Sequence, residues 1–259
     1  MPFLDLAGAR FHYRIDGPAA APVVMLSNSL GTNLAMWDSQ LASLKTRYRL
    51  LRYDSRGHGE SAVTSGPYTI EQLAGDALAL LDALEIERAN FCGLSMGGMI
   101  GQWLGAHAPR RLGKLVLANT TAKIGSPETY NARIDAVRNG GMVAITDAVL
   151  ARWFTPAFLT ASPIAVARVR AMLDATPPDG YVACCEAIRD MDQRETVGGI
   201  GVPTLVIAGT HDVPTPPTDA RFLADRIKGA RYVELPAAHL SNIEAAPAFT
   251  SALIDFIAT

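Results

Sequence analysis

The sequence of 259 residues predicts an α/β fold, in which a mostly parallel β-sheet carries helices on both faces and a helical segment interrupts the sheet. Three observations support this prediction. Short, continuous apolar runs alternate with longer segments of helical periodicity, as expected for buried parallel strands joined by helices. The alternation stops after Asn119, where only helical patterns follow, and resumes at Thr204. Several apolar runs end in small polar residues, as strands do at the ligand-binding edge of such a sheet.

The first half of the chain supplies most of the predicted sheet. The strands that we expect there are Phe3–Leu6, Ala9–Ile15, Val23–Leu26, Leu50–Tyr53, Ala89–Cys92 and Leu115–Ala118. The first two form an antiparallel pair that turns at Ala7-Gly8, because glycine tolerates tight turns. Helices are expected at Trp37–Leu44, Ile70–Leu84 and Met96–His107, the second with leucines and alanines at amphipathic spacing.

A helical block separates the two halves of the sheet. Its predicted helices lie near Pro127–Arg138, Met142–Trp153, Pro163–Leu173 and Gly180–Arg189, with breaks at Gly140-Gly141, Pro156, Ser162-Pro163 and Pro177-Pro178. The sheet pattern then resumes with strands Thr204–Ala208 and Ala230–Leu235 and helices Thr218–Ile227 and Pro247–Ile257. We therefore expect a core formed by residues 1–120 and 198–259 and a helical lid formed by residues 121–197.

Composition and charge exclude several classes of protein. Hydrophobic residues make up 49% of the chain and charged residues 19%, which is typical of a folded globular protein. The net charge of −2 gives no electrostatic basis for binding nucleic acid or an anionic membrane. The three cysteines offer neither a disulfide framework nor zinc-ligand spacing, and no metal site is expected. Without a secretion-signal pattern or a bilayer-length apolar run, we expect a cytoplasmic protein.

The segment G-L-S-M-G at Gly93–Gly97 is typical of a nucleophile elbow, a sharp strand-to-helix turn with a serine at its tip. It follows a predicted buried strand and opens a predicted helix, which is the context that this motif requires. The glycines have a physical purpose, because a side chain at Gly93 or Gly97 would clash with the flanking strand and helix. The pattern predicts that Ser95 is a nucleophile.

Two later strands end in residues that can activate a serine. Thr204–Ala208 leads into Asp212, and Ala230–Leu235 leads into His239. Because the carboxyl ends of parallel strands share one edge of a sheet, we expect both side chains to lie near Ser95. An imidazole can remove the serine proton, and a buried carboxylate fixes the tautomer of that imidazole. The sequence thus predicts a catalytic triad in the order serine, aspartate, histidine.

Other acids and histidines fit these roles less well. Asp54 follows a strand but belongs to a turn-rich loop, and Asp219 is placed to interact with a helix dipole. Asn119, at the end of the strand before the inserted block, carries no charge. His58 is the main competitor for the base, and the glycines on both sides of it indicate a structural role in its loop. The remaining histidines, interpreted as structural or as supporting the site, are His12, His107 and His211.

A tetrahedral oxyanion formed on attack by Ser95 needs preorganised hydrogen-bond donors. One expected donor is the backbone N–H of Met96, directly after the nucleophile. The other should come from the loop after Val23–Leu26. By position we favour the N–H of Ser29, with that of Leu30 as the alternative.

Segments along nearly the whole chain resemble the 3-oxoadipate enol-lactonases of the α/β-hydrolase superfamily. These segments are S-N-S-L-G-T-N at Ser27–Asn33, R-Y-D-S-R-G-H-G-E-S at Arg52–Ser61, C-G-L-S-M-G-G-M-I-G-Q at Cys92–Gln102, A-N-T-T-A at Ala118–Ala122 and A-H-L-S-N-I-E at Ala238–Glu244. The elbow and the R-G-H-G-x-S loop are shared across the superfamily, whereas the first, fourth and fifth segments are more particular to the enol-lactonases. The resemblance implies an α/β-hydrolase fold and hydrolysis of 3-oxoadipate enol-lactone to 3-oxoadipate, a late step of bacterial aromatic degradation through protocatechuate or catechol.

Such a reaction requires no metal or organic cofactor, and its partner is a small lactone. The substrate carries a free carboxylate, which a buried site should meet with a cation. The candidates are Lys123, Arg133, Arg138 and Arg152. Among them we favour Arg133, with Trp153 as an apolar wall.

Other functions use the same fold, and three of them stay open as alternatives. A carbon–carbon bond hydrolase of ring-cleavage products and a general carboxylesterase both use the same triad, so they stay open as alternatives. A ligand-binding module without catalysis is a further alternative, although such proteins usually lack a member of the triad. A dehalogenase is disfavoured, because that chemistry needs a carboxylate where this chain has Ser95.

Overall fold

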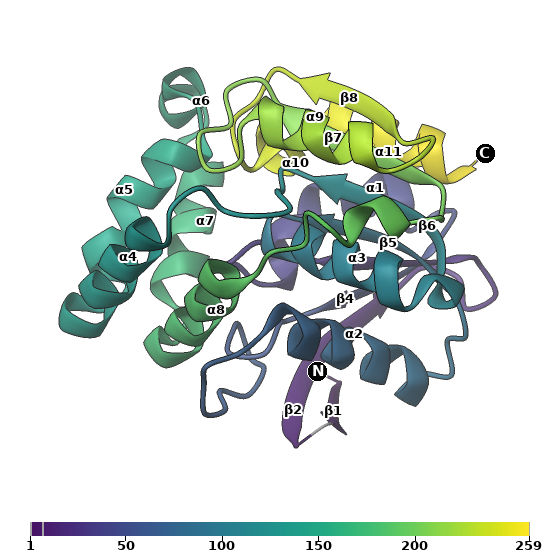
Figure 1. Ribbon diagram of the computed structural model, residues 1–259, viewed down its shortest axis with the longest axis horizontal. Coiled ribbons are helices and arrows are strands. Elements are labelled where there is room, and N and C mark those ends of the chain that lie inside the picture. Colours follow the sequence, from purple (N-terminus) through teal and green to yellow (C-terminus); the bar gives the residue numbers. More distant parts are fainter. Residues whose placement is uncertain (1, 7, 259) are drawn as a thin grey trace.

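The computed structural model describes residues 2–6 and 8–258, and it is built around one eight-stranded sheet (Figure 1). The strands are β1 (Phe3–Leu6), β2 (Ala9–Asp16), β3 (Val23–Ser27), β4 (Arg49–Tyr53), β5 (Ala89–Leu94), β6 (Leu112–Ala118), β7 (Thr204–Gly209) and β8 (Arg231–Leu235). Their order across the sheet is β1-β2-β4-β3-β5-β6-β7-β8. β1 and β2 are antiparallel to their neighbours, and all strands from β4 to β8 in that order run parallel. The predicted fold class is confirmed, and Ala7 of the predicted first turn lies outside the described residues.

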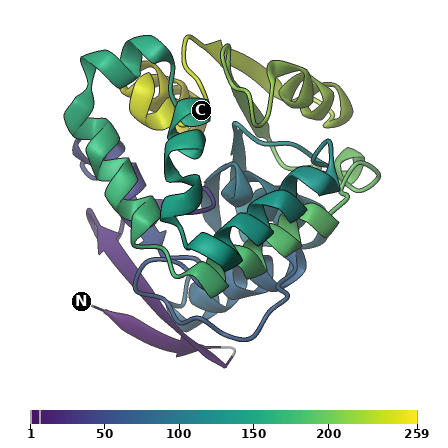
Figure 2. The same ribbon diagram turned by 90° about the vertical axis from the view of Figure 1, so that its left-hand side faces the viewer.

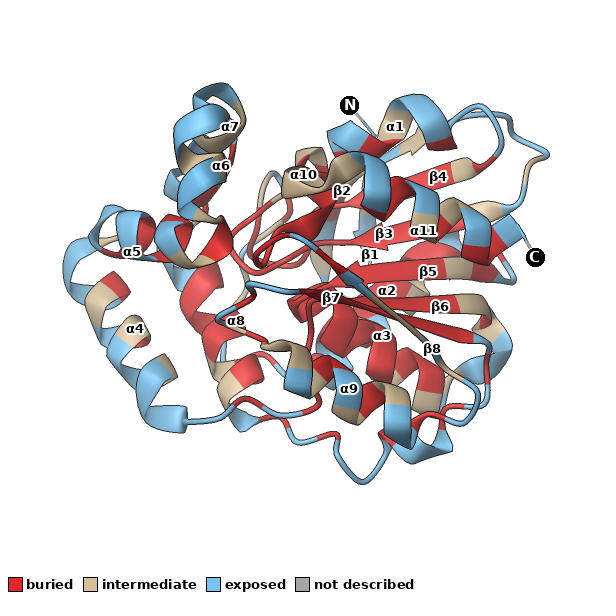
Figure 3. Cartoon of the chain, turned by 90° about the horizontal axis from the view of Figure 1, so that it is seen from above, coloured by how far each residue is buried: buried red, intermediate tan, exposed pale blue. Residues whose placement is uncertain are grey.

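Helices cover both faces of the sheet. The helices of the sheet region are α1 (Asp38–Leu44), α2 (Ile70–Ala83), α3 (Met96–His107), α9 (Pro217–Arg226), α10 (Ser241–Glu244) and α11 (Ala246–Ala258), with short 3-10 turns η1 (Leu34–Trp37), η2 (Pro109–Arg111) and η3 (Val197–Gly199). In Figure 1, α2 and α3 lie in front of the sheet, whereas α1 lies behind it and packs against α11. The central strands are almost fully buried between these layers (Figure 3), which explains their continuous apolar sequences.

Five helices lie between β6 and β7 in the chain and gather at one end of the sheet (Figure 1). They are α4 (Pro127–Gly140), α5 (Val143–Trp153), α6 (Pro156–Ala161), α7 (Pro163–Asp174) and α8 (Pro178–Asp190). Figure 2 shows α4 and α8 side by side, in agreement with their contacts. The sequence interpretation missed α6, because it took Pro156 as a break. Pro156 instead occupies the first turn of α6, where its missing N–H costs nothing, and the Thr155 side chain caps that turn.

The inserted helices rest directly on loops of the sheet region. Gly180 in the first turn of α8 meets Gly57 backbone to backbone, because a Cβ on Gly180 would lie 2.1 Å from the Gly57 carbonyl oxygen. Further along α8, the carbonyl of Ala183 accepts a hydrogen bond of 3.4 Å from the N–H of Tyr68. One end of the inserted block is therefore fixed to the core by main-chain contacts.

The predicted strand–turn–helix around Ser95 is confirmed, and its geometry explains the glycines. Ser95 has φ 57° and ψ −115°, a conformation that non-glycine residues rarely adopt. A Cβ on Gly93 would lie 2.0 Å from the carbonyl oxygen of Gly97, and one on Gly97 would lie 2.2 Å from that of Ser27. Only glycine at both positions allows β3, β5 and α3 to approach this closely.

His58 joins two loops at the carboxyl edge of the sheet. Its Nε2 accepts a hydrogen bond of 2.9 Å from the N–H of Gly31, and its Nδ1 lies 3.3 Å from the carbonyl of Arg56. The ring is therefore a neutral tautomer that donates from Nδ1. Burial lowers the pKa of His58 to about 4, and the carbonyl of Arg56 only partly opposes this effect. The histidine supports the loop that follows β3.

This buried neutral ring makes stability depend on pH. The unfolded chain takes up a proton on His58 below about pH 6.5, but the folded chain does so only near pH 4. The contribution of His58 to the free energy of unfolding is therefore complete above pH 6.5. It is lost as the pH falls toward 4, and the total loss is about 3 kcal/mol. The variant His58→Gln keeps an acceptor for the N–H of Gly31 but cannot be protonated. Between about pH 7.5 and about pH 4.5, we expect its free energy of unfolding to fall by about 2 kcal/mol less than that of the wild type. Urea unfolding at both pH values measures this difference, and equal losses would contradict it.

Candidate active site

Ser95 lies at the tip of the turn between β5 and α3, and it is buried. Its N–H donates a hydrogen bond of 2.9 Å to the carbonyl of Ala118 at the end of β6. Its own carbonyl accepts a hydrogen bond of 2.8 Å from the Thr120 hydroxyl. These main-chain contacts hold the strained turn between two neighbouring strand ends, and the hydroxyl is left to face a pocket.

Asp212 and His239 form a buried pair at the ends of β7 and β8. Nδ1 of His239 lies 2.9 Å from Oδ2 and 3.0 Å from Oδ1 of Asp212. Burial by itself would raise the pKa of Asp212, but the attraction of His239 and several hydrogen bonds outweigh it and lower the pKa from its usual value. The carboxylate therefore stays charged at neutral pH. It orients the ring so that Nε2 is free for proton transfer.

Asn119 and Thr215 also bind the Asp212 carboxylate, and the sequence interpretation did not foresee either contact. Nδ2 of Asn119 donates to Oδ2 at 2.8 Å, as does the Thr215 hydroxyl, and the N–H of Thr215 donates to Oδ1 at 3.0 Å. Asn119 was considered only as a possible acid and set aside for lack of charge. Its position directly after a strand, at the same sheet edge as Asp212, was the available signal.

A narrow pocket brings Ser95 and His239 together with residues of the inserted helices. Its lining comes from the loop after β3, from the elbow and α3, from α4 and α5, and from the loops after β7 and β8: Ser29, Leu30, Ser95, Met99, Tyr130, Arg133, Val149, Arg152, Trp153, Pro214, Thr215 and His239. Within the described residues, no hydrogen bond joins the Ser95 hydroxyl to the His239 ring. Contacts between nucleophile and base often tighten only when substrate binds.

The inserted helices contribute two cations and an aromatic wall to this pocket. The Trp153 ring lies 6.3 Å from that of His239, centroid to centroid, at an angle of 29°. Arg133 lies over the Tyr130 ring at 5.0 Å, and Nε of Arg152 is buried without a hydrogen-bond partner among the described residues. Neither arginine forms an ion pair within the described part of the chain. Both also line an adjoining outer pocket of about 340 Å³.

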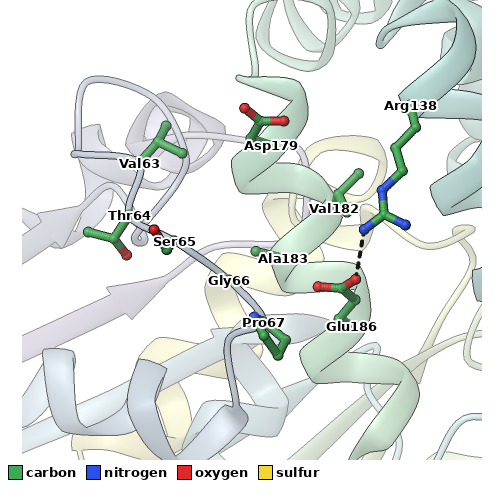
Figure 4. Close-up of a pocket in the computed structure, with 10 residues that line it drawn as sticks. All are labelled: Val63, Thr64, Ser65, Gly66, Pro67, Arg138, Asp179, Val182, Ala183 and Glu186. Carbon is green, nitrogen blue, oxygen red and sulfur yellow. Dashed lines mark hydrogen bonds and ion pairs between the residues drawn. The ribbon is translucent and has the colours of Figure 1, made fainter.

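The other two predicted cations lie elsewhere. Lys123 lines the outer pocket but is not among the lining residues of the pocket at Ser95, and it forms an ion pair of 3.0 Å with Asp192. Arg138 forms an ion pair of 3.0 Å with Glu186 beside a hollow that the loop from Val63 to Pro67 completes (Figure 4). Ser95, Asp212 and His239 do not line this hollow. It is therefore separate from the pocket at the elbow.

Hydrogen bonds in the loop after β3 favour Leu30 over Ser29 as an oxyanion donor. The N–H of Ser29 already donates to Sδ of Met36 at 3.3 Å, and that of Gly31 donates to His58. Among the residues that the structure describes, the N–H groups of Leu30 and Met96 have no hydrogen-bond acceptor. The preference for Ser29 by position does not fit this geometry, because its N–H is engaged by sulfur.

None of the competing acids and histidines is among the residues that line the pocket at Ser95. Asp54 accepts hydrogen bonds from the N–H groups of Leu34 and Glu60 and from His12. Asp219 lies in the first turn of α9, and His107 contacts the carbonyl of Trp103. The exposed His211 precedes Asp212 in its loop.

Within residues 2–6 and 8–258, no group of three or more His, Cys, Asp or Glu side chains could hold a metal ion, and no helix is both long and apolar enough to cross a membrane.

Comparisons with known proteins show the family to which this chain belongs. The family model described as alpha/beta hydrolase fold matches residues 22–246. The chain is 43% identical to 3-oxoadipate enol-lactonase 2 of Acinetobacter baylyi over 93% of this chain and 91% of that protein, and 39% identical to 3-oxoadipate enol-lactonase 1 of the same organism over 96% and 94%. The crystal structure of the enol-lactonase from Burkholderia xenovorans LB400 is 51% identical and covers 100% of both chains, with a TM-score of 0.98. This chain belongs to the α/β-hydrolase family and, within it, to the 3-oxoadipate enol-lactonases.

Proposed function

We propose that this enzyme hydrolyses 3-oxoadipate enol-lactone to 3-oxoadipate, with Ser95 as nucleophile, His239 as general base and Asp212 as the carboxylate that orients it. The observation that carries the proposal is the Asp212–His239 pair, 2.9 Å apart, beside the pocket that Ser95 lines. Close similarity to named enol-lactonases supports the choice of substrate. The reaction belongs to the β-ketoadipate pathway of aromatic degradation.

The first step forms an acyl-enzyme. The Ser95 oxygen attacks the lactone carbonyl carbon while Nε2 of His239 takes the hydroxyl proton. Collapse of the tetrahedral intermediate breaks the ring C–O bond and releases an enolate. The enolate takes up on carbon the proton that His239 removed from Ser95, so it becomes a ketone and His239 is neutral again. Because the ketone is a poor nucleophile, the ring does not readily close again. Water, deprotonated by His239, then attacks the acyl carbon, releases the carboxylic acid and restores the serine.

The N–H groups of Met96 and Leu30 stabilise the oxyanion in this proposal. Neither N–H group has a hydrogen-bond acceptor within the described residues. The N–H of Met96 directly follows Ser95 in the chain, and that of Leu30 lies in the loop after β3, which lines the same pocket. The hydrogen bond from Gly31 to His58 supports the loop in this position. A donor of this kind lowers the barrier by about 3 kcal/mol.

Arg133 and Arg152 bind the free carboxylate of the substrate in this proposal. Both line the pocket at Ser95, neither has an acidic partner within the described residues, and Trp153 provides an apolar wall beside them. A buried guanidinium stays charged and donates several hydrogen bonds, so it favours an anionic ligand over a neutral one. We further propose that residues 121–197 act as a lid, because this segment supplies these groups to the pocket. Cytoplasmic location and the absence of nucleic-acid and membrane partners stay predictions.

Replacing the nucleophile provides the first test. We expect Ser95→Ala to fold and to lower kcat for the enol-lactone by about 10⁴-fold or more, because the oxygen that forms the acyl-enzyme is removed. The assay follows lactone disappearance, with a vinylogous diketo acid and a p-nitrophenyl ester as comparison substrates. Preference of the wild type for the diketo acid would indicate a carbon–carbon bond hydrolase, and preference for the ester a carboxylesterase. Failure of a serine-directed phosphonate to label Ser95 would leave only the binding-module alternative.

Substitution of Arg133 tests carboxylate recognition. We expect Arg133→Ala to raise KM for the enol-lactone by about 10- to 100-fold, because a charge-assisted hydrogen bond is lost, and to spare neutral esters. Arg138→Ala is the matched control, since Arg138 lies on the same helix but pairs with Glu186 outside the pocket. Equal effects of Arg133→Ala on both kinds of substrate would remove Arg133 from this role.

A further inference from the structure

Glu244 at the end of α10 connects two segments that are distant in sequence. Its Oε2 accepts a hydrogen bond of 2.9 Å from the N–H of Ala238, and its Oε1 accepts one of 3.2 Å from the N–H of Thr155. The Thr155 hydroxyl also donates to Oε1. The side chain is partly buried and forms no ion pair within the described part of the chain. Main-chain and hydroxyl donors therefore satisfy the carboxylate on both sides.

On one side, Glu244 fixes the residue that precedes His239. The N–H of Ala238 is held by Glu244, and its carbonyl accepts a hydrogen bond of 3.2 Å from Nδ2 of Asn119. The next residue after the histidine, Leu240, donates its N–H to the carbonyl of Trp153 at 3.2 Å. Peptide groups on both sides of His239 are thus anchored, and the ring can only take the positions that this main chain allows.

On the other side, Glu244 fixes the junction between α5 and α6. Thr155 caps α6 through its hydroxyl and lies two residues after Trp153, whose ring faces that of His239 at 6.3 Å. The same carboxylate therefore sets the position of the histidine loop and of the aromatic side chain against which the histidine packs. A glutamine in its place would turn an N–H₂ group toward one of these N–H donors, and one hydrogen bond would be lost.

We propose that Glu244 is a positioning residue. By bonding to both the loop that carries His239 and the helical segment that carries Trp153, it keeps the His239 ring at the correct position relative to Ser95. The inference rests on the proposed role of His239 as general base. Small displacements of a base relative to its nucleophile reduce the rate of the chemical step far more than they reduce substrate binding.

The experiment compares Glu244→Gln, Thr155→Val and Thr155→Ser with the wild type, and Glu71→Gln, an exposed carboxylate on α2, is the control. For each protein, kcat and KM are measured on the enol-lactone and on a neutral p-nitrophenyl ester. The rate at which a serine-directed phosphonate labels Ser95 and the melting temperature are measured as well. We expect Glu244→Gln to lower kcat and the labelling rate by about 10-fold or more, with KM changed less than about twofold. Thr155→Val should act in the same direction, whereas Thr155→Ser and Glu71→Gln should match the wild type.

A labelling rate and kcat at the wild-type level in folded Glu244→Gln would overturn the proposal, even if the melting temperature fell, because Glu244 would then only stabilise the fold. If Glu244→Gln does not fold, the comparison of Thr155→Val with Thr155→Ser decides in the same way. A wild type that is labelled at Ser95 but inert toward the lactone would overturn only the substrate assignment. A wild type that is not labelled would overturn the triad and this proposal with it.

Discussion

The buried charge of Asp212 is the constraint on which the arrangement of the site depends. The cost of burying a carboxylate away from water must be compensated by hydrogen bonds. Four donors supply them: the Asn119 amide after β6, the N–H and the hydroxyl of Thr215 after β7, and the His239 ring after β8. These contacts tie together the ends of adjacent parallel strands. The position of the His239 ring is therefore set in part by its hydrogen bond to the Asp212 carboxylate. Main-chain contacts of Ala238 and Leu240 hold the loop on both sides of the ring.

The parts of this structure that follow from short-range pattern could be predicted from the sequence. The continuous apolar runs gave the central strands, the glycines around Ser95 gave the strained turn, and the shared edge of a parallel sheet brought Asp212 and His239 together. Features that depend on which donor is already occupied could not be predicted. The engagement of the Ser29 N–H by Met36 and of Asn119 by Asp212 arises only when separate segments meet. Pro156 was misinterpreted, because proline both ends helices and begins them.

The sheet and the inserted helices contribute different chemistry to one pocket. Strand ends supply groups suited to attack on a carbonyl, and they are held by main-chain hydrogen bonds that leave little freedom. The inserted helices supply Arg133, Arg152 and Trp153, which can select a ligand by charge and shape. The elbow motif is shared across the superfamily, whereas the groups that can select a ligand come from the inserted block.

The main-chain contact between Gly57 and Gly180 limits how this enzyme can be redesigned. No side chain separates the two residues, and a Cβ on either one would lie within 2.6 Å of the backbone of the other. A helical block grafted from another hydrolase to alter substrate range would therefore need glycine at the position of Gly180. Only then could its helix approach the loop at Gly57 as closely as α8 does. A Cβ at that position would displace the block from the loop at Gly57, and Arg133, Arg152 and Trp153 would move with it relative to Ser95.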